Sequence, residues 1–290
     1  MSTNSEQPLD IEKALSAAME HQHAGRYAQA EQLYRQVLHA DPNNPVALHL
    51  LGVLAHLARQ SDTGADLIRA AISIAPDYVA AHNNLGKILR ESGKLEEAVE
   101  CYLKAVELKP DYAEAHGNLG NVLCELGEME RGIASLQQAL SHNPDSAQLH
   151  YNLGLALNQE GHGEQALTSL RQAVKINPDL DAAHNSIGLT LQRMGKIDEA
   201  TSSYRQALAI NQDKAEYHIN LARALELQGA LEEALGCYQQ GLKLDPDSKE
   251  AAGSMGSVML ALGKSEEGLA MEREGFGVVS FDLEKGVSVE

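Results

Sequence analysis

The pentapeptide HNNLG, residues 82–86, decides the fold because it recurs along the chain at a fixed spacing. It returns as HGNLG at 116–120, HYNLG at 150–154, HNSIG at 184–188 and HINLA at 218–222. Each copy begins 34 residues after the previous one. A fixed internal period of this length predicts an array of stacked repeats, in which no single core serves the whole chain.

Charge and composition restrict the class of function. The 290 residues include 23 Lys and Arg against 41 Asp and Glu, which gives a formal net charge of −18. Such a chain repels a phosphate backbone, so we expect no nucleic-acid partner. The first ten residues, MSTNSEQPLD, lack the features of an export signal, and the longest apolar run, VALHLLGVLAHLA, is too short to span a bilayer. We therefore expect a soluble, cytoplasmic protein without membrane insertion.

Proline and glycine divide each period into two helices. Repeats begin at Ile11, Pro45, Val79, Ala113, Ala147, Asp181, Ala215 and Lys249. Most end at a proline (Pro42, Pro76, Pro110, Pro144, Pro178 and Pro246), which does not continue a helix. A glycine stands near the middle of seven repeats (Gly25, Gly93, Gly127, Gly161, Gly195, Gly229 and Gly263), where a left-handed residue closes a helix. Each repeat is therefore predicted to be an antiparallel helical hairpin.

Further residues predict how these hairpins begin and pack. An Asp after the proline, followed three residues later by Glu or Gln, has the spacing of a capping box: Asp111 with Glu114, Asp145 with Gln148, Asp213 with Glu216 and Asp247 with Glu250. Small residues such as Gly86 and Ala98 allow the two helices of a hairpin to approach closely. The second repeat has Arg59 in place of the mid-repeat glycine and Gly64 in place of alanine, so we expect a looser hairpin there.

This combination resembles the tetratricopeptide repeat family, whose 34-residue unit has a Leu-Gly pair in its first helix, an Ala and a large residue in its second, and a closing Pro. The resemblance covers Ile11 to about Glu274, as seven clear repeats and a degenerate eighth. It implies an all-α fold, a right-handed α-solenoid of stacked antiparallel helix hairpins. Where the family often has a large aromatic residue, this chain has His82, His116, His150, His184 and His218, which we interpret as buried.

We expect neither a metal nor a cofactor. The five histidines are separated by at least one packed helix pair, whereas ligands of one zinc ion lie within about 2.1 Å of it. The repeats contain no phosphate-binding glycine loop, zinc-protease helix or nucleophile elbow. The chain by itself is therefore predicted not to be an enzyme.

In the family that the chain resembles, the first helices line a concave groove, which implies a protein or peptide partner. The helical spacing predicts one groove-facing column of Asn84, Asn118, Asn152, Ser186 and Asn220, with Asn121, Lys87 and Arg223 beside it. A carboxamide offers donors and an acceptor that match an extended peptide backbone. A similar asparagine ladder is associated with the repeat arm of the O-linked N-acetylglucosamine transferase family. The alternative is that these residues are solvated surface, inherited as the repeats duplicated.

The second repeat differs from its neighbours in the groove. Its groove-facing residues Val46, Leu50, Val53 and Leu57 are all apolar, and an exposed apolar patch of this kind is typical of a contact surface. A partner helix, a second copy of the chain, or the chain's own N-terminal segment around Met19 are the possible occupants.

The two ends of the chain depart from the repeat pattern. Residues 1–10 are predicted to be a flexible N-terminus and 11–274 the repeat array. Residues 275–290, GFGVVSFDLEKGVSVE, contain two strand-like runs and are predicted to form a β-hairpin-like tail or the start of a missing domain. Two functional classes follow. One is a non-enzymatic interaction scaffold. The other is the substrate-recognition arm of a larger enzyme, such as a protein O-GlcNAc transferase-like glycosyltransferase, whose catalytic part lies outside this chain.

Overall fold

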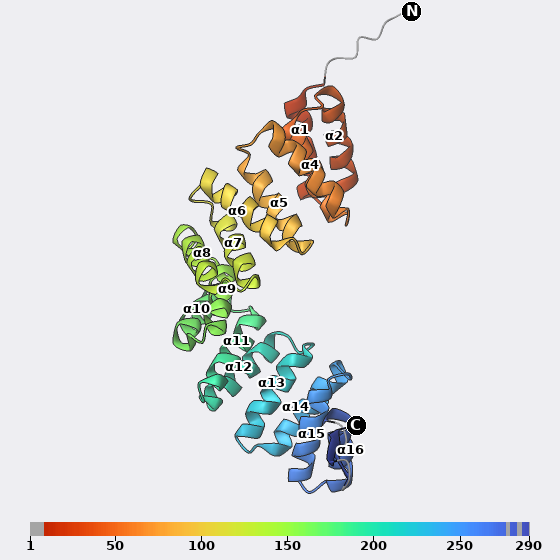
Figure 1. The fold of residues 1–290 in the computed structure, drawn as a ribbon, viewed down its shortest axis with the longest axis vertical. Helices are drawn as coiled ribbons and strands as arrows, with labels where there is room; N and C mark the ends of the chain where they lie inside the picture. Colours follow the sequence, from red (N-terminus) through yellow and green to blue (C-terminus); the bar gives the residue numbers. More distant parts are fainter. Residues whose placement is uncertain (1–8, 277–278, 283–285, 290) are drawn as a thin grey trace, which may run out of the picture. The chain divides into compact units, whose positions relative to one another are not determined.

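The computed structural model describes residues 9–276, 279–282 and 286–289, which form sixteen helices and two strands (Figure 1). The first helices of the hairpins are α1 (Ile11–His23), α3 (Pro45–Leu57), α5 (Val79–Glu91), α7 (Ala113–Glu125), α9 (Ala147–Gln159), α11 (Asp181–Arg193), α13 (Ala215–Leu227) and α15 (Lys249–Ala261). The second helices are α2 (Tyr27–Ala40), α4 (Ser61–Ile74), α6 (Leu95–Leu108), α8 (Met129–His142), α10 (Gly163–Ile176), α12 (Ile197–Ile210), α14 (Leu231–Leu244) and α16 (Ser265–Phe276).

The chain forms two compact units, Met1–Pro144 and Asp145–Glu290, which we call the N-terminal half and the C-terminal half. Within each half, every second helix except the last packs against the first helix of its own hairpin and against that of the next. First helices also contact one another, α3 with α5 and α5 with α7 in the N-terminal half, and α9 with α11 and α11 with α13 in the C-terminal half. These first helices therefore lie side by side in each half.

The predicted phase of the repeats is confirmed. All eight first helices begin at the residues predicted from the sequence. The seven mid-repeat glycines have φ between 72° and 80°, the left-handed conformation that ends a first helix. Each repeat is therefore one helical hairpin, as the periodicity predicts.

The prediction of capping boxes is wrong. The residue that caps α7 is Tyr112, without a side-chain hydrogen bond, so Asp111 lies one residue too early to cap the helix. The same shift applies before α9, α13 and α15, whose capping residues are Ser146, Lys214 and Ser248. Glu114 consequently lies in the first turn of α7 and contacts the preceding hairpin.

A glycine of the first helix packs against a large buried side chain of the second. Tyr102 and Tyr204 are completely buried. A Cβ atom built on Gly86 would lie 2.7 Å from Cε1 of Tyr102, and one built on Gly188 would lie 2.5 Å from Cε1 of Tyr204. Any larger residue would force the helices apart, because such interiors are already close-packed.

The second hairpin is not looser than its neighbours, contrary to expectation. A Cβ atom on Gly64 would lie 2.7 Å from the carbonyl oxygen of Gly52, so the backbones of α3 and α4 approach each other directly. Arg59 occupies the turn with φ 63°, a left-handed conformation that disfavours a residue with a Cβ atom. The turn is strained while the helix pair is tightly packed.

The strands β1 (Val279–Asp282) and β2 (Gly286–Val289) pair antiparallel, with Val279 opposite Val289. Their connection, residues 283–285, lies outside the described residues, as do residues 1–8 of the predicted flexible N-terminus.

Arg59→Gly is expected to stabilise the protein by about 1 kcal/mol, because glycine adopts positive φ without the steric cost that an L-residue bears. Urea unfolding of the variant and the wild type measures this difference. Gly93→Ala is the matched control in the next hairpin, where φ is 74° and no atom lies within 4 Å of the added Cβ. The control should lose a similar free energy of unfolding. A loss of stability in Arg59→Gly would contradict the backbone strain at Arg59.

Candidate functional site

Within each half, the predicted groove residues lie on neighbouring first helices, on a surface that we call the first-helix face of that half. In the N-terminal half, Asn84 and Lys87 on α5 and Asn118 and Asn121 on α7 are all half-buried. In the C-terminal half, Asn152 on α9 is half-buried. By contrast, Ser186 and Asn220, on α11 and α13, are each only 6% exposed. The column is therefore open to a ligand at some of its members and not at others.

Hydrogen bonds between hairpins orient the asparagine side chains of this column. Asn118 donates from Nδ2 to Oδ1 of Asn83 over 3.0 Å, and Asn220 donates in the same way to Asn185 over 3.0 Å. Each bond uses one N–H group of a carboxamide that has a second N–H and an oxygen. Asn152 instead accepts from Nε2 of Gln148 on its own helix over 2.8 Å.

Asn83 and Asn185 complete a polar cluster that the sequence reasoning missed. Asn83 is 1% exposed and Asn185 is 4% exposed. Besides accepting from the column, they donate to the first turn of the next first helix, Asn83 to Glu114 over 3.3 Å and Asn185 to Glu216 over 3.2 Å. The sequence does distinguish these two residues, because each is the asparagine that follows the histidine in HNNLG or HNSIG. The clusters join successive hairpins and satisfy buried carboxamides that would otherwise be costly.

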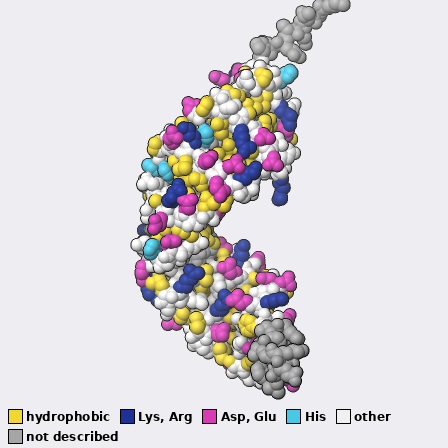
Figure 2. Space-filling model, in the orientation of Figure 1, with side chains coloured by type: hydrophobic (Ala, Val, Ile, Leu, Met, Phe, Trp, Pro, Cys, Tyr) yellow, Lys and Arg dark blue, Asp and Glu magenta, His cyan; other side chains and the backbone are white. Residues whose placement is uncertain are grey.

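Acidic residues of the following hairpin pair with the basic residues predicted on this face. Lys87 pairs with Glu114, and Arg223 lies 2.6 Å from Glu250. Burial raises the pKa of Glu114, but hydrogen bonding to Lys87 and its positive charge outweigh this effect and hold the pKa below its ordinary value. Figure 2 likewise shows acidic and basic side chains interspersed on the side in view. The two predicted cations are therefore partly neutralised by the chain itself.

The apolar patch on α3 is partly covered by the chain. Leu50 packs against the core of the first hairpin, which includes Tyr34. Val53 packs against a core that includes residues of the third hairpin, such as Leu85. Val46 is half-buried, and Leu57 remains 54% exposed. Neighbouring hairpins thus cover the middle of the patch, and its end at Leu57 stays open.

The repeated histidines make polar contacts with the loops between hairpins, and most of them are not core residues. Nε2 of His82 lies 2.8 Å from the carbonyl oxygen of Pro76, and a carbonyl can only accept, so Nε2 carries the proton. His116, His184 and His218 contact the carbonyls of Pro110, Pro178 and Gln212 in the same way at 2.9, 3.0 and 2.9 Å. The interpretation of all five as buried is wrong, because only His82 is buried and the others are half-buried. These half-buried rings extend to a carbonyl oxygen in the loop that precedes each first helix.

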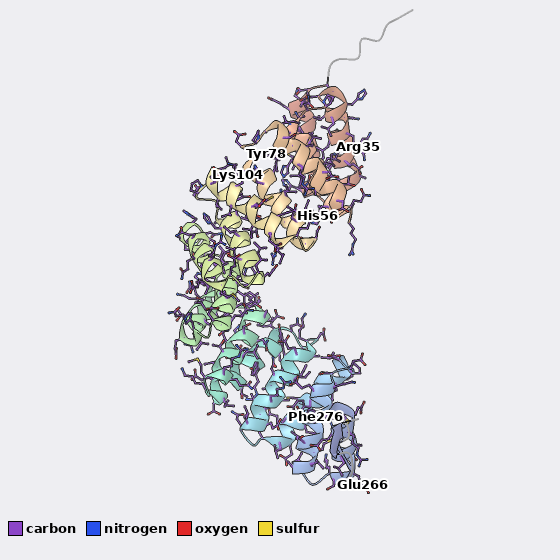
Figure 3. The ribbon with its side chains drawn as sticks, viewed as in Figure 1. Arg35, His56, Tyr78, Lys104, Glu266 and Phe276 are labelled. Carbon is purple, nitrogen blue, oxygen red and sulfur yellow. The ribbon has the colours of Figure 1, made fainter. Side chains whose placement is uncertain are left out.

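His49 on α3 is a buried hydrogen-bonded histidine, 2% exposed. Its Nε2 accepts from Nδ2 of Asn84 at 2.8 Å, so Nδ1 of the neutral ring carries the proton and donates to the Tyr78 hydroxyl at 2.9 Å. Tyr78 and His56 lie toward opposite ends of the pair formed by α3 and α5 (Figure 3). At the end where His56 lies, its Nε2 is 3.0 Å from Glu91 and makes a second polar contact between the two helices. Burial lowers the pKa of His49 to about 4. His49 therefore joins the second and third hairpins in its neutral form.

The N-terminal half should lose stability as the pH falls from about 6.5 to 4. In this window the unfolded chain protonates His49 and the folded chain does not, since the folded pKa is about 4 against the ordinary 6.5. The loss contributed by His49 reaches about 3 kcal/mol at the acid end and is absent above pH 7. Urea unfolding at several pH values measures it. His49→Asn, the residue found at the equivalent position as Asn83 and Asn185, should flatten the dependence. If His49→Asn has the same pH dependence of stability as the wild type, the acid destabilisation does not come from His49.

Three hairpins share a buried tyrosine whose hydroxyl is bound by the first helix. Tyr34 donates to Oε1 of Gln22 at 2.8 Å, Tyr204 to Oε1 of Gln192 at 2.9 Å, and Tyr238 to Oε2 of Glu226 at 3.0 Å. In the third hairpin the equivalent pair is Tyr102 and Arg90. Arg90 has only donors and pairs with Glu125, and the hydroxyl of Tyr102 is buried without a partner among the described residues.

Tyr102→Phe is expected to leave stability unchanged or to raise it by about 1 kcal/mol, because it removes a buried hydroxyl that has no hydrogen bond. The matched control, Tyr204→Phe, removes a hydroxyl bonded to Gln192 and should cost about 1 kcal/mol. Thermal and urea unfolding of both variants compare them. A substantial loss in Tyr102→Phe would mean that this hydroxyl is bonded in solution.

Models of the repeat family match most of the chain. One described as "TPR repeat" matches residues 86–127, and others described as "Tetratricopeptide repeat" match residues 15–79, 67–100, 127–211 and 186–249. Together they extend without a gap from residue 15 to residue 249. The chain belongs to the tetratricopeptide repeat family. The presence of this fold implies protein or peptide partners.

Solved structures of other proteins share the fold. A structure of MamA is 28% identical, with 58% of this chain and 98% of that chain covered at a TM-score of 0.54. YrrB, described as a TPR protein with an unusual peptide-binding site, is 24% identical, with 69% and 99% covered at a TM-score of 0.55. The C-terminal part of a TPR repeat-containing protein from Cytophaga hutchinsonii is 18% identical, with 82% and 97% covered at a TM-score of 0.63. No curated protein matches the chain significantly.

Two further properties concern the described part of this tetratricopeptide repeat chain. Its His, Cys, Asp and Glu side chains form no group of three or more that could hold a metal ion. None of its helices is long and apolar enough to cross a membrane.

Proposed function

We propose that this protein is a non-enzymatic interaction scaffold whose N-terminal half binds an extended segment of a partner protein along the first-helix face of α3, α5 and α7. The observation that carries the proposal is the orientation of Asn84 and Asn118. Both are half-buried, and both are held by a hydrogen bond to the preceding hairpin, at 2.8 and 3.0 Å. A fixed carboxamide binds a peptide group with less loss of side-chain entropy than a mobile one.

The chemistry of this face suits a peptide backbone. An extended chain presents alternating N–H and C=O groups, and each carboxamide has a further N–H and an oxygen to pair with them. Asn121 lies about one helical turn from Asn118 on α7 and adds a third carboxamide to the same surface. Contacts of this kind recognise the backbone and depend little on the ligand's side chains.

The apolar residues of α3 extend the proposed surface. The open end of the apolar patch at Leu57 lies on α3, and α3 contacts the helix that carries Asn84. An exposed apolar residue next to oriented polar groups is a usual composition for a peptide site. We infer that a ligand segment contacts Leu57 with an apolar side chain while the carboxamides hold its backbone.

The comparison with known structures supports the class of function. The unusual peptide-binding site ascribed to YrrB belongs to a protein that shares this fold. The ligand, and the residues that bind it here, are part of the proposal. In the C-terminal half the column contributes less to it, since Ser186 and Asn220 are buried and Asn220 joins two hairpins through its bond to Asn185.

The substrate-recognition arm of a larger enzyme, such as a protein O-GlcNAc transferase-like glycosyltransferase, would use the same face to hold a substrate protein. It stays an alternative prediction. A cytoplasmic location, the absence of a nucleic-acid partner, and self-association through the second repeat or the tail also stay predictions.

Selection of peptides from a random display library on the purified protein tests the proposal. The selected peptides should bind with a Kd that calorimetry can measure, and Asn121→Ala combined with Asn118→Ala should weaken them at least tenfold. Asn43→Ala, in an exposed loop between the first two hairpins, is the matched control and should have no effect. Circular dichroism checks that each variant folds. Failure to select any peptide, or equal affinity in the double variant, would contradict binding at this face.

A further inference from the structure

The third hairpin lacks the hydrogen-bond acceptor that three other hairpins supply to their buried tyrosine. In the first, sixth and seventh hairpins a Gln or Glu side chain of the first helix accepts from the buried tyrosine. At the equivalent position the third hairpin has Arg90, whose guanidinium has five N–H donors and no acceptor. The hydroxyl of Tyr102 is consequently left without a partner in a completely buried side chain.

Arg90 takes the place of the acceptor in the sequence, but its side chain pairs with the fourth hairpin. Its Nε donates to Oε1 and Oε2 of Glu125 at 2.9 and 3.2 Å. Arg90 stands 12 residues before the tyrosine, the position from which Gln22 and Gln192 reach the hydroxyl in their own hairpins. The side chains of Arg90 and Glu125 are 35% and 40% exposed, so the ion pair lies at the surface of the first-helix face.

We propose that Tyr102 and Arg90 form a subsite for the carboxylate of an Asp or Glu side chain in the bound partner segment. The Tyr102 hydroxyl is buried in the free protein, so the Arg90 side chain moves away from Glu125 as the ligand binds. The carboxylate then pairs with the Arg90 guanidinium and accepts a hydrogen bond from the Tyr102 hydroxyl, as Gln22 and Gln192 do in their own hairpins. This inference rests on the proposed function, because it names the side chain that the same face prefers.

The exchange of partners favours such a ligand. Arg90 exchanges one carboxylate, that of the exposed Glu125, for another, so its ion pairing changes little. In return the ligand satisfies a buried hydroxyl, and hydrogen bonds to an ionised acceptor are stronger than those to a neutral one. A carboxamide side chain also accepts from Tyr102 but gains less from Arg90, so we expect Glu to bind more tightly than Gln.

The charges around the subsite are mixed. Lys87 lies one turn before Arg90 on α5 and favours an anion, while Glu91, Glu114 and Glu125 disfavour it. Lys87 pairs with Glu114, so these two charges offset each other, whereas Glu91 accepts a hydrogen bond from Nε2 of His56 and keeps its negative charge. The net charge of −18 acts over a longer range, but salt screens it beyond about 8 Å at physiological ionic strength. The local geometry of Arg90 and Tyr102 therefore decides the preference.

Small probes test the subsite without a complete peptide ligand. N-acetyl-glutamate α-methylamide has the side-chain carboxylate, and the glutamine and norleucine equivalents are its neutral and apolar controls. NMR spectra of the full chain with carbon-labelled tyrosine should show a saturable shift of the Tyr102 signal with the glutamate probe, at least fivefold weaker binding of the glutamine probe, and no shift with norleucine. The Tyr102→Phe spectrum assigns the signal.

Two substitutions should remove this response. Arg90→Gln supplies the acceptor found in the sister hairpins, so it should fold normally and weaken the glutamate probe at least tenfold, as followed by amide signals of α5 and α7. Tyr102→Phe should weaken it similarly, and Tyr204→Phe, the matched control, should not. Unchanged binding in Arg90→Gln, or no shift of Tyr102 at any probe concentration, overturns the subsite.

The result separates the subsite from the proposed function. If selected peptides bind the first-helix face and depend on Asn118 and Asn121, but the glutamate probe leaves Tyr102 unaffected, the subsite fails and the scaffold stands. If the probe binds at Tyr102 and no peptide is selected, the subsite stands and the peptide-binding function fails.

Discussion

The close contact between a glycine of the first helix and a large buried side chain of the second is the constraint on which the rest of the structure depends. At Gly86 and Gly188 there is no room for a Cβ atom beside the tyrosine rings of Tyr102 and Tyr204. The contact sets the distance between the two helices of a hairpin and thereby the position of every residue on the first helix. Because the geometry repeats, residues 34 positions apart occupy equivalent places, and hairpins stack in one register.

This regular stacking produces the polar contacts between hairpins. Asn118 reaches Asn83, and Asn220 reaches Asn185, at the same distance of 3.0 Å in the two halves. Each such bond contributes about 1 kcal/mol, but an unpaired carboxamide at Asn83 or Asn185 would cost more than that, since both are buried. The bonds therefore specify the register of stacking and also orient the side chains of the proposed binding surface.

A specific function is most readily found at positions where one hairpin differs from the equivalent residues of the others. Three hairpins satisfy their buried tyrosine internally, and one replaces the acceptor by Arg90. The second hairpin replaces the polar groove residues by Val46, Leu50, Val53 and Leu57, with Leu57 still exposed. Both departures lie in the N-terminal half. A partner that binds there would be recognised by differences between repeats, upon a framework that the repeats share.

The sequence by itself determined the helices, their boundaries and the family, because period, proline and left-handed glycine are local signals that act within one repeat. It also identified the column of Asn84, Asn118, Asn152, Ser186 and Asn220 as equivalent residues. Only the tertiary structure decided their environments. The burial of Ser186 and Asn220, the pairing of Lys87 and Arg223 with glutamates, and the isolated hydroxyl of Tyr102 all depend on side chains from residues about 12 to 35 positions away. Periodicity shows which residues are equivalent, but contacts across hairpins depend on the particular residues that meet there.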